Sequence, residues 1–135
     1  MISFPNIIPA RLLGKNSPSN KITVGMIGTG NHGIHRNLNM FLRQSDAKVL
    51  AVSDVFKSRM IKAHKMTNDY YKNNDCSMHS DFREILDRDD IDTVMISTPD
   101  HWHALMSSMA IRRGKDVICE KPTLTVAEGR YIANL

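Results

Sequence analysis

The chain has 135 residues, of which 41% are hydrophobic and 24% charged, a size and composition typical of one globular domain. Its apolar runs are shorter than the roughly 20 residues of a membrane-spanning helix, which excludes that class. The net charge of +4 is uneven, because residues 1–72 hold eleven Lys/Arg against three Asp/Glu. No Lys/Arg block with interleaved aromatic residues accompanies it, so the asymmetry favours a solvated helix surface over a nucleic-acid-binding face.

Short β-branched runs alternate with helical patterns along most of the chain. Residues 1–20, with Pro5 and Pro9, indicate a linker that leads into one domain at 21–135. Runs of strand type occur at 22–27, 49–52, 92–97 and 116–119, with a weaker run at 76–78. Helical spacing of apolar residues occurs at 34–42, 60–71, 82–86, 100–114 and 125–135. This repetition predicts an α/β fold with a doubly wound, mostly parallel sheet covered on both faces.

Several of these helices begin at residues that favour a helix N-terminus. Ser80 or Asp81 is expected to cap the short third helix, and Asp100 the fourth. Thr125 and Glu128 have the spacing of a capping box at the start of the last helix. The apolar stripe predicted to face inward on the fourth helix consists of Trp102, Leu105, Met109 and Ala110.

A glycine pattern, Gly28-Thr29-Gly30-Asn31-His32-Gly33, lies between the first strand and the first helix. The first glycine permits a tight turn, the second lets a pyrophosphate approach the backbone, and the third lets helix and strand pack closely. The helix N-terminus then offers N–H groups and a favourable dipole to phosphate groups. The pattern predicts a dinucleotide-binding loop, with an ordinary glycine turn as the alternative.

An acidic residue, Asp54, follows the second strand, 21 residues after Gly33. A carboxylate at this place accepts hydrogen bonds from ribose hydroxyls. It also repels a 2′-phosphate, which favours NAD over NADP. Lys57 and Arg59 stand nearby and would offset part of this repulsion. We therefore predict NAD as the cofactor, with NADP less favoured.

The segment Thr98-Pro99-Asp100-His101-Trp102-His103 directly follows the fourth strand. Ligands of open α/β sheets bind outside the carboxyl ends of the strands, so this position predicts a binding loop. The two histidines raise the question of a metal site, but they diverge at a helix start and no third ligand is evident, so no metal is predicted. A purely structural role, in which Trp102 packs and Asp100 caps, is the alternative.

Glu120-Lys121-Pro122 follows the fifth strand, at the same edge of the predicted sheet. A lysine beside a carboxylate at a ligand crevice holds a substrate hydroxyl and stabilises a developing alkoxide. Pro122 fixes the turn and favours an extended backbone at Lys121. A surface ion pair without a catalytic role is the alternative.

Together these motifs resemble the Gfo/Idh/MocA oxidoreductase family, whose members include glucose–fructose oxidoreductase and inositol dehydrogenase. The glycine pattern is common to many families, whereas the 98–103 and 120–122 motifs at this spacing are much more specific. The resemblance runs over 21–135 and implies an N-terminal Rossmann domain followed by a C-terminal α/β substrate domain. That second domain would be absent here. The last helical pattern still runs at Leu135, so a chain truncated at its C-terminus is expected.

The resemblance also implies which residues form the site. The cofactor-binding positions of the family fall on Gly28, Gly30, Asn31, His32, Gly33, Asp54, Thr98, Pro99, Trp102, His103, Glu120 and Lys121. The glycine loop would hold the pyrophosphate, Asp54 the adenosine ribose, and the loop after the fourth strand the nicotinamide side. Lys121 is the implied catalytic residue, in contact with both substrate and cofactor.

The activity implied is hydride transfer between NAD and a carbinol carbon of a sugar, inositol or related polyol. The partner is then a small molecule rather than nucleic acid or a membrane, the fragment alone is inactive, and the full-length parent is a homo-oligomer. NAD-dependent glycoside hydrolysis and non-enzymatic dinucleotide sensing are alternatives, and the intact 120–122 motif favours the dehydrogenase. Residues 1–20 resemble the segment after a twin-arginine export signal, so the bacterial cytoplasm and the periplasm both stay open as locations.

Overall fold

The structure is a computed structural model that describes residues 20–121 and 123–135. The predicted linker up to residue 19 and Pro122 lie outside the described residues. The described part forms a parallel sheet in the order β3-β2-β1-β4-β5. Its strands are β1 (Ile22–Ile27), β2 (Ala47–Ser53), β3 (Ser77–His79), β4 (Thr93–Ile96) and β5 (Asp116–Cys119).

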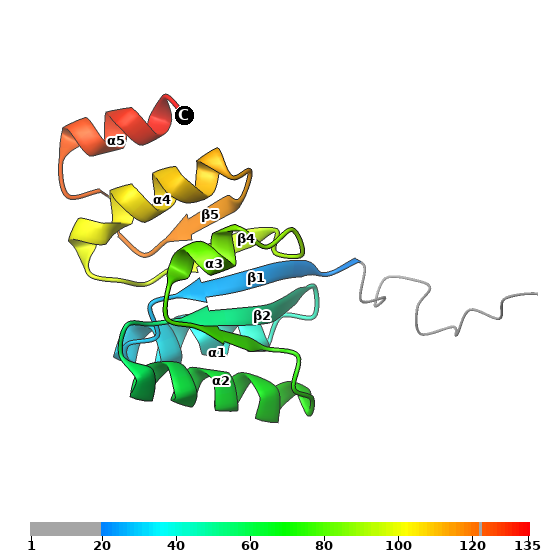
Figure 1. Ribbon diagram of the computed structural model, residues 1–135. Helices are drawn as coiled ribbons and strands as arrows, with labels where there is room; N and C mark the ends of the chain where they lie inside the picture. Colours follow the sequence, from blue (N-terminus) through cyan, green and yellow to red (C-terminus); the bar gives the residue numbers. More distant parts are fainter. Residues whose placement is uncertain (1–19, 122) are drawn as a thin grey trace, which may run out of the picture.

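Helical segments connect the strands and lie on both sides of the sheet (Figure 1). In chain order they are η3 (Gly33–Leu38), α1 (Asn39–Leu42), α2 (Lys57–Tyr71), α3 (Phe82–Leu86), η4 (Asp100–Trp102), α4 (His103–Arg112) and α5 (Val126–Ala133). The chain builds outward from β1 to β3 and then returns to β4 on the other side of β1. This confirms the predicted doubly wound α/β fold and places its switch point between β1 and β4.

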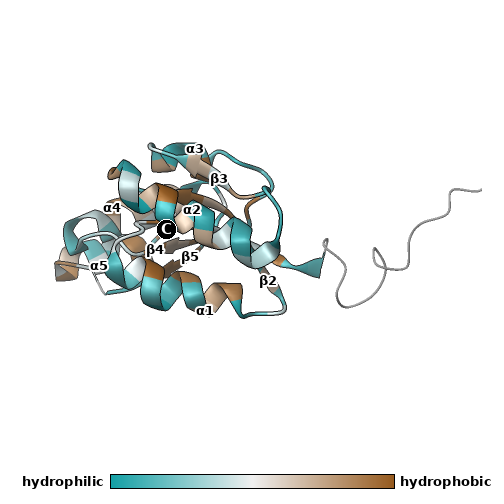
Figure 2. Ribbon diagram, turned by 90° about the horizontal axis from the view of Figure 1, so that it is seen from below, coloured by the Kyte–Doolittle hydropathy of each residue, from teal (hydrophilic) through white to brown (hydrophobic). Residues whose placement is uncertain are grey.

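Separate hydrophobic cores fill the two faces of the sheet. On one face Leu38, Phe41, Met60 and Ala63 pack with residues of β1 and β2. On the other face the residues of the second core come from α3, α4, the strands and the turn before β4, and include Ile85, Leu86, Ile91, Ile96, Met106 and Ala110. Figure 2 shows the hydrophobic residues concentrated in the strands, with hydrophilic residues on the outer sides of the helices. Burial on both faces explains why the strands read as nearly continuous apolar runs.

The first helix differs from the predicted regular α-helix. Residues 31 and 32 are α-helical, but Gly33–Leu38 form a π-helix before the α-helical turn Asn39–Leu42. Such wide turns are rare and are frequent at functional sites. The expected apolar side is retained, since Ile34, Leu38 and Phe41 are buried.

The predicted inner stripe of the fourth helix is partly wrong. Ala110 is buried, but Trp102 and Leu105 are 41% and 48% exposed, and the buried residues include His103 and Met106. A 3-10 turn, η4, precedes α4 and has about three residues per turn, so the α-helical phase starts at His103.

The helix ends show which capping predictions hold. Asp81 caps α3 by accepting a hydrogen bond of 2.9 Å from the N–H of Arg83. The Thr125–Glu128 capping box is confirmed at α5. Asp100 is no side-chain cap, because it lies inside the 3-10 turn rather than before it. The last helix ends at Ala133 and does not continue to residue 135.

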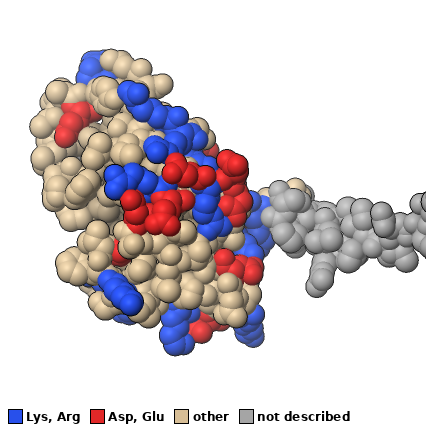
Figure 3. All heavy atoms as spheres, viewed as in Figure 1, with Lys and Arg blue, Asp and Glu red and all other residues tan. Residues whose placement is uncertain are grey.

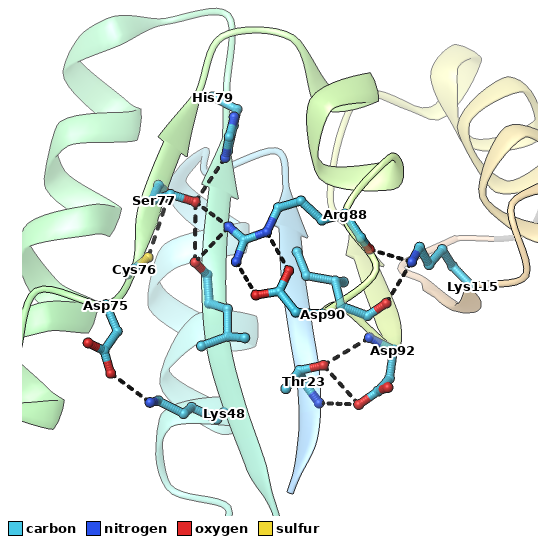
Figure 4. A network of polar contacts seen from close by, with 12 residues as sticks. Thr23, Lys48, Asp75, Cys76, Ser77, His79, Arg88, Asp90, Asp92 and Lys115 are labelled. Atoms are coloured by element: carbon cyan, nitrogen blue, oxygen red, sulfur yellow. Dashed lines mark hydrogen bonds and ion pairs between the residues drawn. The ribbon is translucent and has the colours of Figure 1, made fainter. Parts of the chain in front are cut away.

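Charged side chains gather toward the amino ends of the strands on the face seen in Figure 3, whereas the side of the carboxyl ends is mostly uncharged. We call residues Thr23, Ser77, Arg88, Asp90, Asp92 and Lys115 the amino-edge network (Figure 4). Arg88 pairs with Asp90 at 2.6 Å and also donates to the Ser77 hydroxyl at 2.5 Å. Lys115 Nζ donates to the carbonyls of Arg88 and Ile91 at 2.6 and 2.8 Å. The network therefore ties β3, the turn before β4 and the start of β5 together.

Candidate functional site

A cavity of about 530 Å³ opens at the carboxyl ends of the strands. Its lining includes Gly28 after β1, Asp54 after β2, Ser80 after β3 and Thr98 after β4. The volume is within the usual range of small-molecule sites. The place, beside the switch point of a doubly wound sheet, is where such folds bind ligands. The loops that follow these strands therefore form one candidate site.

Two glycines of the loop are required by the packing of the chain itself. Gly28 has a φ of +88°, and a Cβ there would lie 2.7 Å from the carbonyl carbon and oxygen of Ser97. A Cβ on Gly33 would collide with the carbonyl oxygen of Gly28. The tight turn and the close packing of the helix on β1 thus account for the first and third glycines.

The second glycine, Gly30, is not required by the packing of the chain. A Cβ there would meet Arg59 Nη1 at 3.8 Å as its nearest described neighbour, so the fold would tolerate a side chain. Gly30 lines the cavity, and the helix that begins at residue 31 follows it directly. The first N–H groups of a helix lack intrahelical partners and attract anions. The open space above Gly30 therefore fits a phosphate group that comes close to the backbone.

Asp54 is nearly buried, at 9% exposure, and lines the same cavity. Its Oδ2 accepts hydrogen bonds from the N–H of Thr29 at 2.7 Å and from the hydroxyl of Thr29 at 3.2 Å. Its Oδ1 accepts from the N–H of Phe56 at 2.8 Å. The carboxylate thus holds the glycine loop in place through its hydrogen bonds with Thr29. Because a carboxylate offers about four acceptor positions, it retains capacity for a ligand hydroxyl.

Sequence reasoning missed part of the cavity wall. Phe56 lines it, and the guanidinium of Arg59 lies 4.4 Å from the centroid of the Phe56 ring. Residues 80–83, after β3, line it as well. The weak strand signal at 76–78 was the one clue to this loop, because a third strand there places its carboxyl end at the same edge.

The loop after β4 contributes Thr98, Pro99 and Trp102 to the lining of the cavity. Its role in binding stays a prediction. His103 takes another place: it is 1% exposed, and its Nε2 donates to the carbonyl oxygen of Thr98 at 2.8 Å. His103 therefore fixes the loop after β4 through this hydrogen bond. It is not among the described residues that line the cavity. The His101 ring lies 6.0 Å from that of Trp102.

The turn after β5 meets the glycine helix rather than the cavity. His32 Nε2 donates to the Glu120 carboxylate at 2.9 Å, while Lys121 is exposed at the same edge. Burial by itself would raise the pKa of Glu120. The nearby Asn37 side chain and His32, whose Nε2 bonds to the carboxylate, together outweigh burial and lower that pKa. The predicted residues Asn31, His32, Gly33, Glu120 and Lys121 thus lie outside the described lining of the cavity.

Known proteins match both the sequence and the fold. The profile of the oxidoreductase family with an NAD-binding Rossmann fold, Gfo/Idh/MocA, matches residues 22–135. The chain belongs to the Gfo/Idh/MocA oxidoreductase family. It is 34% identical over 108 residues to an inositol 2-dehydrogenase/D-chiro-inositol 3-dehydrogenase of Shouchella clausii. It is also 34% identical over 115 residues to an alpha-N-acetylgalactosaminidase of Shewanella oneidensis.

Solved structures of this family have the same fold. The 3-ketoreductase from Actinomadura kijaniata in complex with NADP and TDP-benzene superposes with a TM-score of 0.75 at 25% identity over 85% of this chain. The apo scyllo-inositol dehydrogenase from Lactobacillus casei gives 0.73 at 25% identity over 85%. The chain spans 34% and 32% of those two chains. It spans 30% of the Shouchella and 24% of the Shewanella relative.

The Gfo/Idh/MocA assignment makes the chain part of an NAD(P)-binding Rossmann family. The open space above Gly30 and the remaining acceptor capacity of Asp54 fit the pyrophosphate and a ribose of such a cofactor. The preference for NAD over NADP stays a prediction. In the described part of the chain, no three His, Cys, Asp or Glu side chains come together as metal ligands. No helix within residues 20–121 and 123–135 is long and apolar enough to cross a membrane.

Proposed function

We propose that this chain is the dinucleotide-binding domain of a dehydrogenase that acts on a sugar, inositol or related polyol. The cavity carries the proposal, because it joins the glycine loop, Asp54 and the Thr98–Trp102 loop along one edge of the sheet. The names of the inositol dehydrogenases and of the 3-ketoreductase support a substrate with carbinol or keto carbons.

In this proposal the described residues have the following roles in cofactor binding and hydride transfer. Bound NAD(P) supplies the hydride donor or acceptor. The helix N-terminus after Gly30 stabilises the pyrophosphate, and Asp54 accepts a hydrogen bond from a ribose hydroxyl. Lys121 donates a hydrogen bond to the reacting oxygen and stabilises its alkoxide charge. The partner that takes the proton would lie in the part of the relatives that this chain does not span.

A second candidate, NAD-dependent glycoside hydrolysis, is favoured by the identity to the Shewanella alpha-N-acetylgalactosaminidase. The two reactions differ in whether NAD is consumed overall. A dehydrogenase reduces one NAD for each substrate oxidised, whereas the glycosidase regenerates its NAD within each turnover. Net NADH formation with polyols, measured on a longer protein that contains this chain, separates them. Hydrolysis without net NADH would favour the second candidate.

The first experiment is a titration of this chain with NADH and with NADPH. Trp102 is the single tryptophan of the sequence and lines the cavity. Its emission should fall as reduced nicotinamide binds nearby and its energy passes to the ligand. A Gly30→Ala variant is the matched control, since it fills the proposed phosphate position without a clash in the fold. A folded chain that gives no fluorescence change and no heat on mixing would contradict the proposal.

A further inference from the structure

Ser97 directly follows β4, at the place where the glycine loop and the loop after β4 meet. It lines the cavity, although no sequence pattern predicted it as a site residue. Its backbone N–H donates to the carbonyl of Ile27 at 2.8 Å, which fixes it to the end of β1. A Cβ on Gly28 would lie 2.7 Å from the Ser97 carbonyl group, and one on Gly33 would lie 3.3 Å from the Ser97 Cβ. Ser97 therefore packs directly against the loop that would hold the pyrophosphate.

Asn37 sets the direction of the Ser97 hydroxyl. Asn37 lies in the π-helix and is 2% exposed, and its Nδ2 donates to Ser97 Oγ at 2.8 Å. An amide NH₂ group is only a donor, so the hydroxyl oxygen is the acceptor in this contact and its own proton points elsewhere. Within the described part of the chain, that proton has no acceptor. Ser97 is only partly buried, so it keeps one unused donor at the wall of the cavity.

Two neighbouring hydroxyl groups of the same loops already have partners. The Thr29 hydroxyl, in the glycine loop, donates to Asp54 Oδ2 at 3.2 Å and is fully buried. The Thr98 hydroxyl, in the loop after β4, donates to the sulfur of Met106 at 3.7 Å. The Ser97 hydroxyl differs from both, because the protein fills its acceptor role and leaves its donor role open. An open donor of this kind suits a ligand that carries acceptor oxygens.

We propose that the Ser97 hydroxyl donates a hydrogen bond to a pyrophosphate oxygen of the bound dinucleotide, and that Asn37 is the positioning residue that directs this proton. Phosphate oxygens are acceptors that serine hydroxyls commonly bind. Hydrogen bonds to a charged oxygen are also stronger than those between neutral groups. This inference rests on the proposed function, because it adds a contact to the same cofactor site. The hydroxyl would supplement the backbone N–H groups of the helix that follows Gly30.

The first test is a calorimetric titration with NADH and with ADP-ribose, which has the same pyrophosphate but no nicotinamide. Ser97→Ala removes the donor and should weaken both ligands by about tenfold, the effect of one lost hydrogen bond to a charged group. Ser108→Ala is the matched control, since Ser108 is 6% exposed and its hydroxyl donates to the Leu105 carbonyl at 2.8 Å within α4. The control should bind both ligands normally. A loss confined to NADH, or no loss in Ser97→Ala, would overturn the proposal.

Asn37→Asp tests the positioning role. The new carboxylate is an acceptor, so it takes up the Ser97 proton and turns it away from the ligand. This variant should weaken NADH by about tenfold, but by less than about twofold in a chain that already carries Ser97→Ala, because both changes remove one contact. Asn39→Asp controls for the added charge, since the Asn39 side chain donates to the His35 carbonyl at 3.0 Å. Equal losses from Asn37→Asp with and without the Ser97 hydroxyl would overturn the positioning role.

Phosphorus NMR of the bound ligand gives a signature that a packing defect does not produce. The pyrophosphate signals of bound NADH should differ between the wild-type chain and Ser97→Ala, and should stay in place in Ser108→Ala. Unchanged signals in Ser97→Ala would overturn the proposed contact even if binding were weaker. A folded wild-type chain that binds neither ligand would contradict the proposed function, and this inference with it. Normal binding by both the wild-type chain and Ser97→Ala would overturn this inference alone.

Discussion

The two edges of the sheet use their polar residues in opposite ways. At the amino edge, Arg88, Asp90 and Lys115 bond to one another or to backbone carbonyls (Figure 4). At the carboxyl edge, Arg59 stacks on Phe56 beside the cavity and has no carboxylate partner among the described residues.

The difference follows from the physics of buried polar groups. A polar group removed from water must find a partner, and the amino-edge network supplies partners from within the chain. At the carboxyl edge, some groups retain unused bonding capacity that faces an open cavity, which is what a ligand requires. Changes in the amino-edge network should therefore lower stability, and changes at carboxyl-edge positions that face open space in the cavity, such as Gly30 and Arg59, should lower binding. Gly28 is at the carboxyl edge but is required by packing, so its change should lower stability. Each variant below tests that separation.

The glycine loop should give the largest effect. Gly28→Ala combines a positive φ with a backbone clash and should lower the free energy of unfolding by about 2–4 kcal/mol, measured by urea denaturation. Gly114→Ala is the control, since its φ is +72° but no described atom lies within 4 Å of an added Cβ. It should lose about 1 kcal/mol. Gly30→Ala should keep its stability but lose dinucleotide binding. A loss of stability in Gly30→Ala would contradict the conclusion that Gly30 serves binding rather than packing.

Arg88→Met should give the second-largest effect, a loss of stability. It leaves Asp90 and the Ser77 hydroxyl without their donor, and should lower the free energy of unfolding by about 1–3 kcal/mol. Dinucleotide affinity should stay at the wild-type value. Lys65→Met is the control, because the Lys65–Asp69 ion pair is on the surface with side chains 73% and 63% exposed. That change should cost less than about 0.5 kcal/mol. An Arg88→Met chain of normal stability would contradict a structural role for the network.

Arg59→Met should lower dinucleotide binding and leave stability nearly unchanged, the reverse of Arg88→Met. Thermal unfolding should change little, because Arg59 has a ring contact but no ion pair in the described structure. Binding of NADH and NADPH should weaken by about tenfold as a charged phosphate contact is lost. If Arg59 reaches a 2′-phosphate, NADPH loses more than NADH. Lys57→Met, two residues earlier on the exposed side of α2, should bind normally. Equal losses in both variants would mean a general charge effect instead.

The smallest effect concerns pH. The hydrogen bond from Arg88 lowers the pKa of Asp90 below its ordinary value. A carboxyl pKa lowered on folding contributes stability above its unfolded pKa of about 3.9, and this is lost as pH falls through the folded value. Asp90→Asn should therefore destabilise at neutral pH by a few tenths of a kcal/mol, since Asp90 is 59% exposed. The difference from wild type should vanish in acid; a gap that persists there would exclude the ionised pair as its cause.

Local patterns were enough to predict much of this molecule. The order of strands and helices, the glycine loop, Asp54 after β2 and the Thr125–Glu128 capping box were all readable from spacing. The reason is that periodicity, turn geometry and capping depend on residues only a few positions apart. Because parallel strands share one carboxyl edge, the same order also placed the loops after β1, β2 and β4 together.

Other features depended on the tertiary structure. The short edge strand β3 gives little periodic signal, so the contribution of residues 80–83 to the cavity became visible only when β3 paired with β2. The 3-10 turn before α4 changed the helix phase and buried His103 beneath the loop it follows. Asn37 acquired its hydrogen-bond partner, Ser97, from a loop that is 60 residues away in the chain. The sequence by itself determined the fold and the kind of ligand, because both follow from short-range patterns. The tertiary structure decided which side chains face the ligand and which hold the loops, because those choices depend on contacts between distant segments.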